Sequence, residues 1–236
     1  MRSFRFACRA TGGQARTAKE WCELALRAED LGYDTFGVSD HFATAFAPLV
    51  LQLVATCTSR PRLAMLVLNN DFRHPAVLAK EAATLDLLSG GRLELGMGAG
   101  WQPPDYEQSE HPVRPGPGPR RALRESLQVL KRLFGDAPAT MAGRHWAVRG
   151  LSGVPAPMQR PHPPLMVGGT GPRLLRMAAE EADIVGFDSG PATMALSTWS
   201  LSALAEKARL VREAAQSSDV ELHLNPEVWA VGANRR

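Results

Sequence analysis

Residues 73–101 read RHPAVLAKEAATLDLLSGGRLELGMGAGW and contain a helix, a turn and a strand in succession. Pro75 stands at a position that favours the first turn of a helix, and Gly90 and Gly91 follow Leu88, where we expect the helix to end. The short apolar run 93–97 predicts a buried strand. Because a helix that leads into a buried strand is the repeating unit of parallel α/β proteins, this stretch predicts that fold class.

The same alternation extends in both directions along the chain. Further strands are expected at 4–8, 33–38, 63–68, 165–167, 183–187 and 221–231. Further helices are expected at 17–31, 47–59, 119–134, 172–181 and 193–215. Seven strands separated by helices fit either a parallel barrel or an open doubly wound sheet, and the periodicity does not separate the two.

One region interrupts the alternation. Residues 135–164 have no clear period and include the proline-dense stretch APMQRPHPP, which predicts an ordered loop or an insertion before the fifth strand. The chain has 236 residues, a length that a single α/β barrel often reaches. We therefore interpret 1–236 as one domain.

Composition excludes several classes of protein. The net charge is only +3, the basic residues are scattered and aromatic residues make up 6%, which argues against a nucleic-acid partner. The three cysteines include no C-x-x-C pair, which argues against a disulfide framework and a zinc site. The N-terminus has no apolar stretch typical of a secretory signal, and no apolar segment is long enough to span a bilayer. We expect a cytoplasmic protein with no membrane partner.

Polar or glycine residues follow five of the predicted strands. They are Ser39, Asp40 and His41; Asn69, Asn70 and Asp71; Gly98, Ala99 and Gly100; Gly168, Gly169, Thr170 and Gly171, with Arg173 beyond them; and Asp188 and Ser189. Ligands of parallel α/β folds bind at the carboxyl ends of the strands, so these residues predict one shared site. The remaining histidines lack metal-ligand spacing, and we expect no metal site.

Three stretches carry a family resemblance: LGYDTFGVSDH at 31–41, the stretch 73–101 quoted above, and PHPPLMVGGTGPRLLRMAAEEADIVGF at 161–187. They resemble the bacterial luciferase-like superfamily, in particular its branch of oxidoreductases that use the deazaflavin coenzyme F420. The resemblance implies a TIM-barrel-like parallel barrel that carries the ring system at the strand mouths. It also implies a homodimer, with helices 47–59 and 75–88 at the interface. The family barrel has eight strands, so we expect an incomplete barrel of about seven strands, with the eighth strand–helix unit missing.

The resemblance implies roles for the residues around the predicted ring. His41 matches a histidine near the reactive ring with an acid–base or orienting role; the alternative is a strand-end histidine that bonds a backbone carbonyl. Asp40 would bond the cofactor or fix the tautomer of His41; the alternative is a turn residue. The family often has a cis peptide bond not involving proline in strand three, forming a bulge behind the ring; it would fall near Met65 to Val67, and Leu66 would contact the cofactor there. Asn69 would reach the carbonyl edge of the ring, or serve only the turn.

The glycine-rich turns are expected to bring backbone close to the cofactor. Gly98, Ala99 and Gly100 form one such turn. Gly168, Gly169, Thr170 and Gly171 precede a helix and predict a phosphate cradle, to which Arg173 adds positive charge. Trp101 departs from the deazaflavin sugar-phosphate dehydrogenases, where a catalytic glutamate can follow this glycine. This difference argues against their acid–base chemistry.

Three functions remain open from the sequence. The first is an oxidoreductase that transfers a hydride between coenzyme F420 and a small organic substrate. The second is a monooxygenase that uses reduced flavin mononucleotide (FMN) and oxygen. The third is a non-catalytic binding protein. Substrate contacts are expected in the loops 101–118 and 188–198, so the sequence does not identify the substrate.

Overall fold

The computed structural model describes residues 4–10, 15–43, 47–187, 201–215 and 220–224. The chain forms two compact units, residues 1–166 and 167–236, and each is described by itself. Each of the seven predicted strands has a counterpart among the described residues. The interpretation of the chain as one domain stays a prediction.

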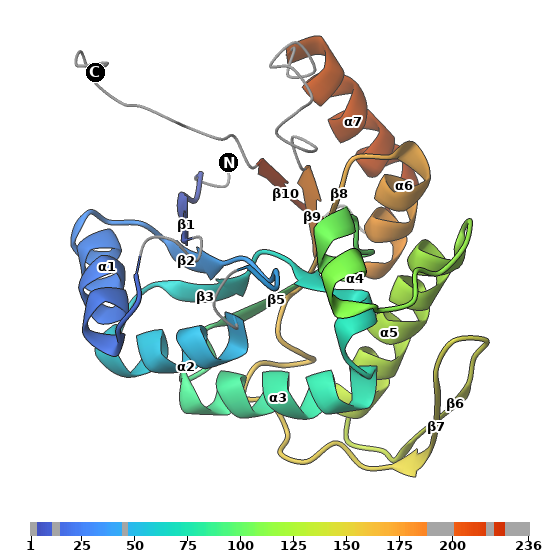
Figure 1. Cartoon of the computed structure of the whole chain (residues 1–236), viewed down its shortest axis with the longest axis horizontal. Coiled ribbons are helices and arrows are strands. Elements are labelled where there is room, and N and C mark those ends of the chain that lie inside the picture. The colour runs from blue at the N-terminus through green and yellow to red at the C-terminus, as the bar shows by residue number, and fades with distance from the viewer. Residues whose placement is uncertain (1–3, 11–14, 44–46, 188–200, 216–219, 225–236) are drawn as a thin grey trace. The chain divides into compact units, whose positions relative to one another are not determined.

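The first unit contains a parallel sheet (Figure 1). Its strands, in the order in which they pair, are β1 (Ala7–Ala10), β2 (Thr35–Val38), β3 (Arg62–Met65) and β5 (Leu93–Gly98). β4 (Leu68–Asn69) continues the line of β3 and also pairs with β5, so that Asn69 is opposite Gly98. The first strand begins three residues later than predicted, because Phe4 and Phe6 are exposed rather than in the core.

A cis peptide bond between Leu66 and Val67 separates β3 from β4, where the family resemblance placed one. Two neighbouring glycines make room for this segment. A Cβ atom at position 37 would overlap the Leu66 side chain, and one at position 96 would overlap the carbonyl oxygen of Met65. Gly37 and Gly96 are therefore explained by close packing around the irregular strand.

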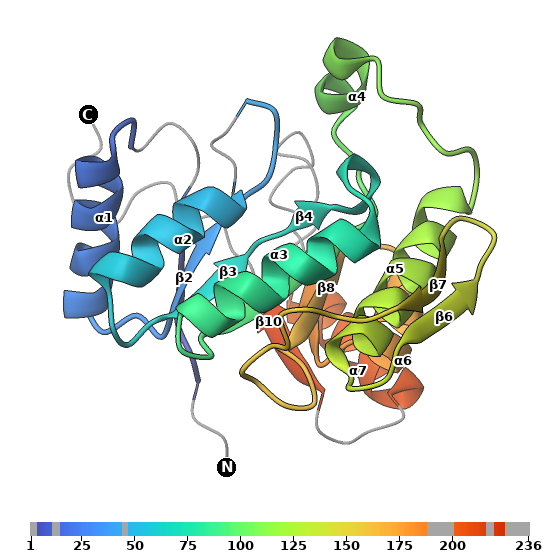
Figure 2. The ribbon, with the colours of Figure 1, turned by 90° about the horizontal axis from the view of Figure 1, so that it is seen from below.

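Helices α1 (Ala18–Asp30), α2 (Ala47–Cys57), α3 (Pro75–Leu88) and α5 (Gly118–Phe134) follow one another along one side of this sheet (Figure 2). Two of these helices, α1 and α3, begin with side-chain caps. Thr17 and Glu20 form a capping box at the start of α1, and the His74 ring accepts the backbone N–H of Ala76 at the start of α3. His74 is therefore the N-cap residue of α3.

Two regions that were expected to be loops or insertions, 101–118 and 135–164, contain short elements that the sequence did not predict. The loop 101–118 contains α4 (Pro103–Ser109). A short 3₁₀ turn, η1 (Asn70–Phe72), directly follows β4 and was also not predicted. Residues 135–164 contain an antiparallel hairpin of β6 (Ala139–Ala142) and β7 (Ala147–Leu151). These elements are short and partly exposed, so they impose no strong apolar period.

The second unit continues the alternation of strands and helices. It comprises β8 (Leu165–Gly169), which begins at the boundary, α6 (Pro172–Glu181), β9 (Ile184–Phe187), α7 (Leu201–Ala214) and β10 (Glu221–Leu224). β10 pairs with β9 in parallel, and α6 packs against α7. The predicted helix residues 193–200, the strand residues 225–231 and the strand-end pair Asp188 and Ser189 lie outside the described residues. Within the described part of the chain, no helix has the length and apolar character needed to cross a bilayer.

Candidate active site

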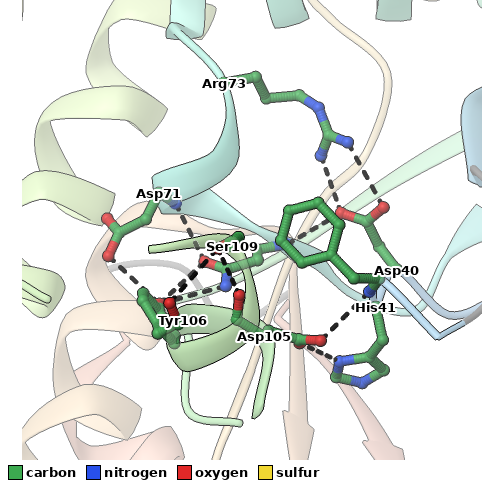
Figure 3. Close-up of polar contacts among 9 residues, drawn as sticks. Asp40, His41, Asp71, Arg73, Asp105, Tyr106 and Ser109 are labelled. Carbon is green, nitrogen blue, oxygen red and sulfur yellow. Dashed lines mark hydrogen bonds and ion pairs between the residues drawn. The ribbon is translucent and has the colours of Figure 1, made fainter. Parts of the chain in front are cut away.

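The carboxyl end of β2 presents a buried carboxylate that holds two neighbouring segments together. Ser39 and Asp40 are buried directly after the strand. Asp40 Oδ2 accepts the backbone N–H of Asn69 at 3.3 Å and Nη1 of Arg73 at 2.9 Å, while Nη2 of Arg73 lies 3.4 Å from Oδ1 (Figure 3). Asp40 is thus engaged with Arg73 and the β4 backbone.

The side chain of His41 is held by an aspartate that the sequence did not single out. His41 Nδ1 lies 2.7 Å from Asp105 Oδ2, and the other carboxylate oxygen of Asp105 accepts the backbone N–H of Phe42 at 3.1 Å (Figure 3). The Asp105 side chain is 3% exposed and that of His41 is 26% exposed. A buried carboxylate in contact with a partly exposed imidazole fixes the orientation of the ring while leaving part of it accessible.

Two exposed aromatic residues adjoin His41. The Trp101 ring meets the His41 ring edge-on, with 6.0 Å between the ring centroids, and Trp101 is 53% exposed. Phe42 is 58% exposed, and its ring packs against the ring of Phe72 with 4.7 Å between the ring centroids. Position 101 therefore places an aromatic ring beside His41, and not a carboxylate that could take part in acid–base chemistry.

The end of β4 is joined to α4 by a network of buried polar groups. The Asn69 amide donates to the Tyr106 hydroxyl at 3.1 Å, and that hydroxyl lies 3.2 Å from Asp71 Oδ2 (Figure 3). Arg114 forms an ion pair with the other oxygen of Asp71. Burial raises the pKa of Tyr106 above its usual value, and Asp71 adds to the rise. Tyr106 therefore stays a neutral hydroxyl that fixes α4 against the strand end.

The first glycine turn lies beside this network. Gly98 is the last residue of β5 and pairs with Asn69, and Ala99 follows it half-buried. Gly100 has φ +83°, and a Cβ atom there would overlap the Tyr106 hydroxyl and lie 2.7 Å from Asn69 Oδ1. Packing against Tyr106 thus accounts for Gly100.

The first unit brings together the predicted site residues of three strand ends. Asp40, Asn69 and Gly98 are linked through β4, Gly100 contacts Asn69, and Leu66 stands at the cis peptide bond next to Gly37. Sequence reasoning missed Asp105, Tyr106 and Arg73 as members of this arrangement. Arg73 belongs to the quoted R-H-P pattern, which offered a signal, but Asp105 and Tyr106 lie in a region interpreted as a variable loop.

The second unit holds the other predicted glycine turn, between β8 and α6. Gly171 is the N-cap residue of α6 and makes no side-chain cap hydrogen bond. Thr170, Gly171 and Arg173 are exposed, and Gly168 is partly exposed. A Cβ atom at position 169 would overlap the Leu174 side chain, so Gly169 is explained by packing, whereas position 171 faces open space. An exposed helix start with an adjacent arginine suits an anion.

Fold and site together define a class: a TIM-barrel-like α/β protein with a histidine and buried carboxylates at its strand ends. The model of the luciferase-like monooxygenase family matches residues 2–229, and the chain belongs to this family.

Individual relatives agree with this assignment. The 5,10-methylenetetrahydromethanopterin reductase of Methanopyrus kandleri is 31% identical over 175 residues, which cover 66% of this chain and 48% of the reductase. A Mycobacterium tuberculosis protein named as a coenzyme F420-dependent oxidoreductase is 31% identical over 181 residues, covering 72% of this chain and 51% of its own. The chain thus spans about half the length of these relatives.

Solved structures show the same fold. The coenzyme F420-dependent tetrahydromethanopterin reductase of Methanopyrus kandleri has a TM-score of 0.76 and 24% identity, with 94% of this chain and 64% of that chain covered. The oxygenating constituent of 3,6-diketocamphane monooxygenase from Pseudomonas putida, in complex with FMN, has a TM-score of 0.68 and 20% identity, with 94% and 64% covered. The predicted TIM-barrel-like, luciferase-like fold is confirmed.

Proposed function

We propose that this chain is an oxidoreductase that transfers a hydride between coenzyme F420 and a small organic substrate. The observation that carries the proposal is the His41–Asp105 pair at the end of β2, in a chain whose curated relatives are named for F420 and for reduction of a methanopterin. A strand-end histidine held by a buried carboxylate is suited to orient a substrate hydroxyl or carbonyl and to exchange a proton with it.

The residues of the first unit suit a flat, polar ring. The Asn70 amide is buried, and among the described residues neither its oxygen nor its nitrogen has a hydrogen-bond partner. A buried donor–acceptor pair of this kind complements the imide edge of a deazaflavin or flavin. The absence of a side chain at Gly98 allows close approach to the same strand end.

The second unit supplies an element suited to a phosphate. The open start of α6, with Gly171 uncapped and Arg173 exposed, suits a phosphate group. When bound, the cofactor supplies the hydride chemistry, and the protein supplies binding and orientation.

The residues around His41 have separable tasks in this proposal. His41 holds or moves the proton that accompanies hydride transfer at the substrate oxygen, and Asp105 holds the ring in place. Asp40 and Arg73 neutralise one another and keep the ends of β2 and β4 in register, so we assign Asp40 an architectural task in addition to the cofactor contact proposed from the sequence. Trp101 and Phe42 exclude water and favour an apolar substrate body.

A second candidate is an FMN-dependent monooxygenase. The structural similarity to an FMN-bound monooxygenase supports it, as does the aromatic residue Trp101 beside His41. A third candidate is the non-catalytic binding protein that the sequence left open.

Cofactor titration separates the three candidates. Purified protein is titrated with oxidised F420 and, separately, with FMN, and binding is followed by absorbance and fluorescence. Binding of F420 supports the first proposal, and preference for FMN supports the second. A folded protein that binds neither contradicts both and leaves the third.

Replacement of His41 then tests the catalytic assignment. His41→Gln should lower turnover by roughly 10²–10⁴-fold, the usual contribution of a general acid or base, with little loss of cofactor affinity. His74→Asn, which keeps a capping side chain at the start of α3, is the matched control. Unchanged turnover in His41→Gln would remove His41 from the mechanism.

We also propose that the protein is a homodimer that uses α2 and α3. Leu49 on α2 and Val77 and Leu88 on α3 are all more than half exposed, which is unusual for large apolar side chains gathered on neighbouring helices. Light scattering coupled to gel filtration measures the mass, and Leu49→Glu should shift a dimer toward the monomer. A wild-type mass equal to one chain contradicts this proposal.

A further inference from the structure

We propose that Asp105 is a positioning residue that fixes the tautomer of His41, so that Nδ1 carries the ring hydrogen and Nε2 is the proton-exchanging atom. Its importance for turnover rests on the proposed function of His41. The tautomer itself follows from the geometry of this chain alone and is measured without cofactor or substrate.

The two oxygens of Asp105 serve two different donors on consecutive residues. Oδ1 accepts the backbone N–H of Phe42 at 3.1 Å, and Oδ2 lies 2.7 Å from His41 Nδ1. An ionised carboxylate only accepts hydrogen bonds. The ring nitrogen that faces it must therefore carry a hydrogen, and in the neutral imidazole this leaves the lone pair on Nε2.

The position of Asp105 is set independently of His41. The next residue, Tyr106, is buried, and its hydroxyl interacts with Asn69 and Asp71 at the end of β4. The Ser109 hydroxyl donates to the backbone carbonyl of Asp105 within the same helix. Because α4 is fixed to the strand end in this way, Asp105 acts as a rigid acceptor to which the imidazole must adjust.

A purely structural explanation makes a different prediction. If Asp105 served only to hold the Phe42 backbone, any acceptor at position 105 would be sufficient and the His41 tautomer would not depend on it. Asparagine distinguishes the two explanations because it has one acceptor oxygen. With that oxygen on the Phe42 N–H, the amide nitrogen faces Nδ1 and donates to it, which drives the ring hydrogen to Nε2.

The test is nitrogen NMR of protein labelled with ¹⁵N-histidine, at a pH where the rings are neutral. His41→Gln identifies the His41 signals by their loss. In the wild-type protein we expect a protonated, pyrrole-type Nδ1 and an unprotonated, pyridine-type Nε2. In Asp105→Asn the two types should exchange, and in Asp105→Glu, which keeps two acceptor oxygens, the wild-type pattern should return. Glu107→Gln, an equal charge change on an exposed residue of α4, should leave the pattern unchanged.

The kinetic readout follows from the tautomer. Asp105→Asn should lower kcat by roughly 10²–10⁴-fold with little change in KM, because the proton-exchanging atom is lost while binding contacts remain. Glu107→Gln should keep wild-type kinetics.

Each outcome bears on one proposal or the other. A wild-type His41 with its hydrogen on Nε2, or an Asp105→Asn variant that keeps the wild-type pattern, overturns the tautomer proposal. If Asp105→Asn does not fold, the wild-type signals still decide the question. Failure of cofactor binding with the expected tautomers would refute the proposed function alone.

Discussion

Gly100 packs so closely against Tyr106 that no side chain fits between the β5 turn and the hydroxyl of the tyrosine. Gly100→Ala would introduce a Cβ atom that overlaps the Tyr106 hydroxyl and would also place alanine at φ +83°. The clash and the backbone strain together should lower the free energy of unfolding by roughly 2–4 kcal/mol. Urea denaturation followed by circular dichroism measures the change.

A second glycine separates the two contributions. Gly116 also has positive φ, +54°, but a Cβ atom there would meet nothing within 4 Å. Gly116→Ala should therefore cost only about 1 kcal/mol, the backbone contribution. Equal losses in the two variants would show that contact with Tyr106 contributes nothing.

The sequence predicted the strand–helix alternation well, for a physical reason. The strand β5 is buried along its whole length, which requires a short apolar run, and helices such as α5 bury one apolar face, which repeats with a period of about 3.6 residues. The expected helix starts at Thr17 and Pro75 lie within one residue of the observed starts. Local chemistry and burial agree at these positions, so both were visible in the chain alone.

The site could be predicted only in part. His41, Asn69 and Gly98 follow apolar strands, and their positions indicated a shared site. Asp105 gave no such signal, because α4 is short and starts with two prolines. His41 and Asp105 are 64 positions apart in the sequence and meet only in the folded chain. The partner of a functional side chain is fixed by tertiary contacts, which no local pattern encodes.

Asn70 provides a prediction that links stability to cofactor binding. Its buried amide has no hydrogen-bond partner among the described residues, and burying an unpaired polar group costs roughly 1–3 kcal/mol. Asn70→Leu, of similar size and shape, should stabilise the cofactor-free protein by about that amount and weaken cofactor binding at least tenfold. Thermal unfolding and titration measure the two effects. A less stable variant would mean that the amide is already satisfied in the free protein.

Glu81 on α3 should make stability depend on pH. Burial raises the pKa of Glu81, an effect that Asp40 reinforces and Arg73 opposes, and Glu81 Oε2 is buried without a partner among the described residues. The folded state binds the proton of Glu81 more tightly than the unfolded state does. The free energy of unfolding of the protein therefore falls as the pH rises above about 4.5 and Glu81 loses this proton. Glu81→Gln should therefore gain stability relative to the wild type between pH 4 and pH 7, as measured by urea denaturation at each pH. Glu107→Gln is the control. A difference in the free energy of unfolding between Glu81→Gln and the wild type that stays constant with pH would refute the raised pKa of Glu81.

Glu125 on α5 should have the opposite pH dependence. Burial alone would raise its pKa, but the backbone N–H groups of His145, Trp146 and Arg144 bond its carboxylate and together hold the pKa below its usual value. Glu125→Gln should lower the free energy of unfolding by roughly 1–2 kcal/mol at neutral pH; the loss is modest because the side chain is partly exposed. The folded pKa is lowered, so this stabilisation is present above pH 4.5 and should fade as the pH falls below it. A difference from the wild type that grows in acid would contradict this reasoning.

Cys57 at the end of α2 should resist alkylation although it is not fully buried. Burial is the main cause that raises its pKa from 9.0 to about 12, and the hydrogen bond with Cys22 adds to the rise. Because the thiolate is the reactive form, iodoacetamide at pH 8 should modify Cys57 on the order of 10³-fold more slowly in the folded protein than in urea. Mass spectrometry of peptides after timed labelling gives both rates on the same residue. Cys22→Ala should raise the alkylation rate of Cys57 in the folded protein only in part, because the thiol stays buried. A rate in folded Cys22→Ala equal to the rate in urea would mean that Cys22 alone protects Cys57.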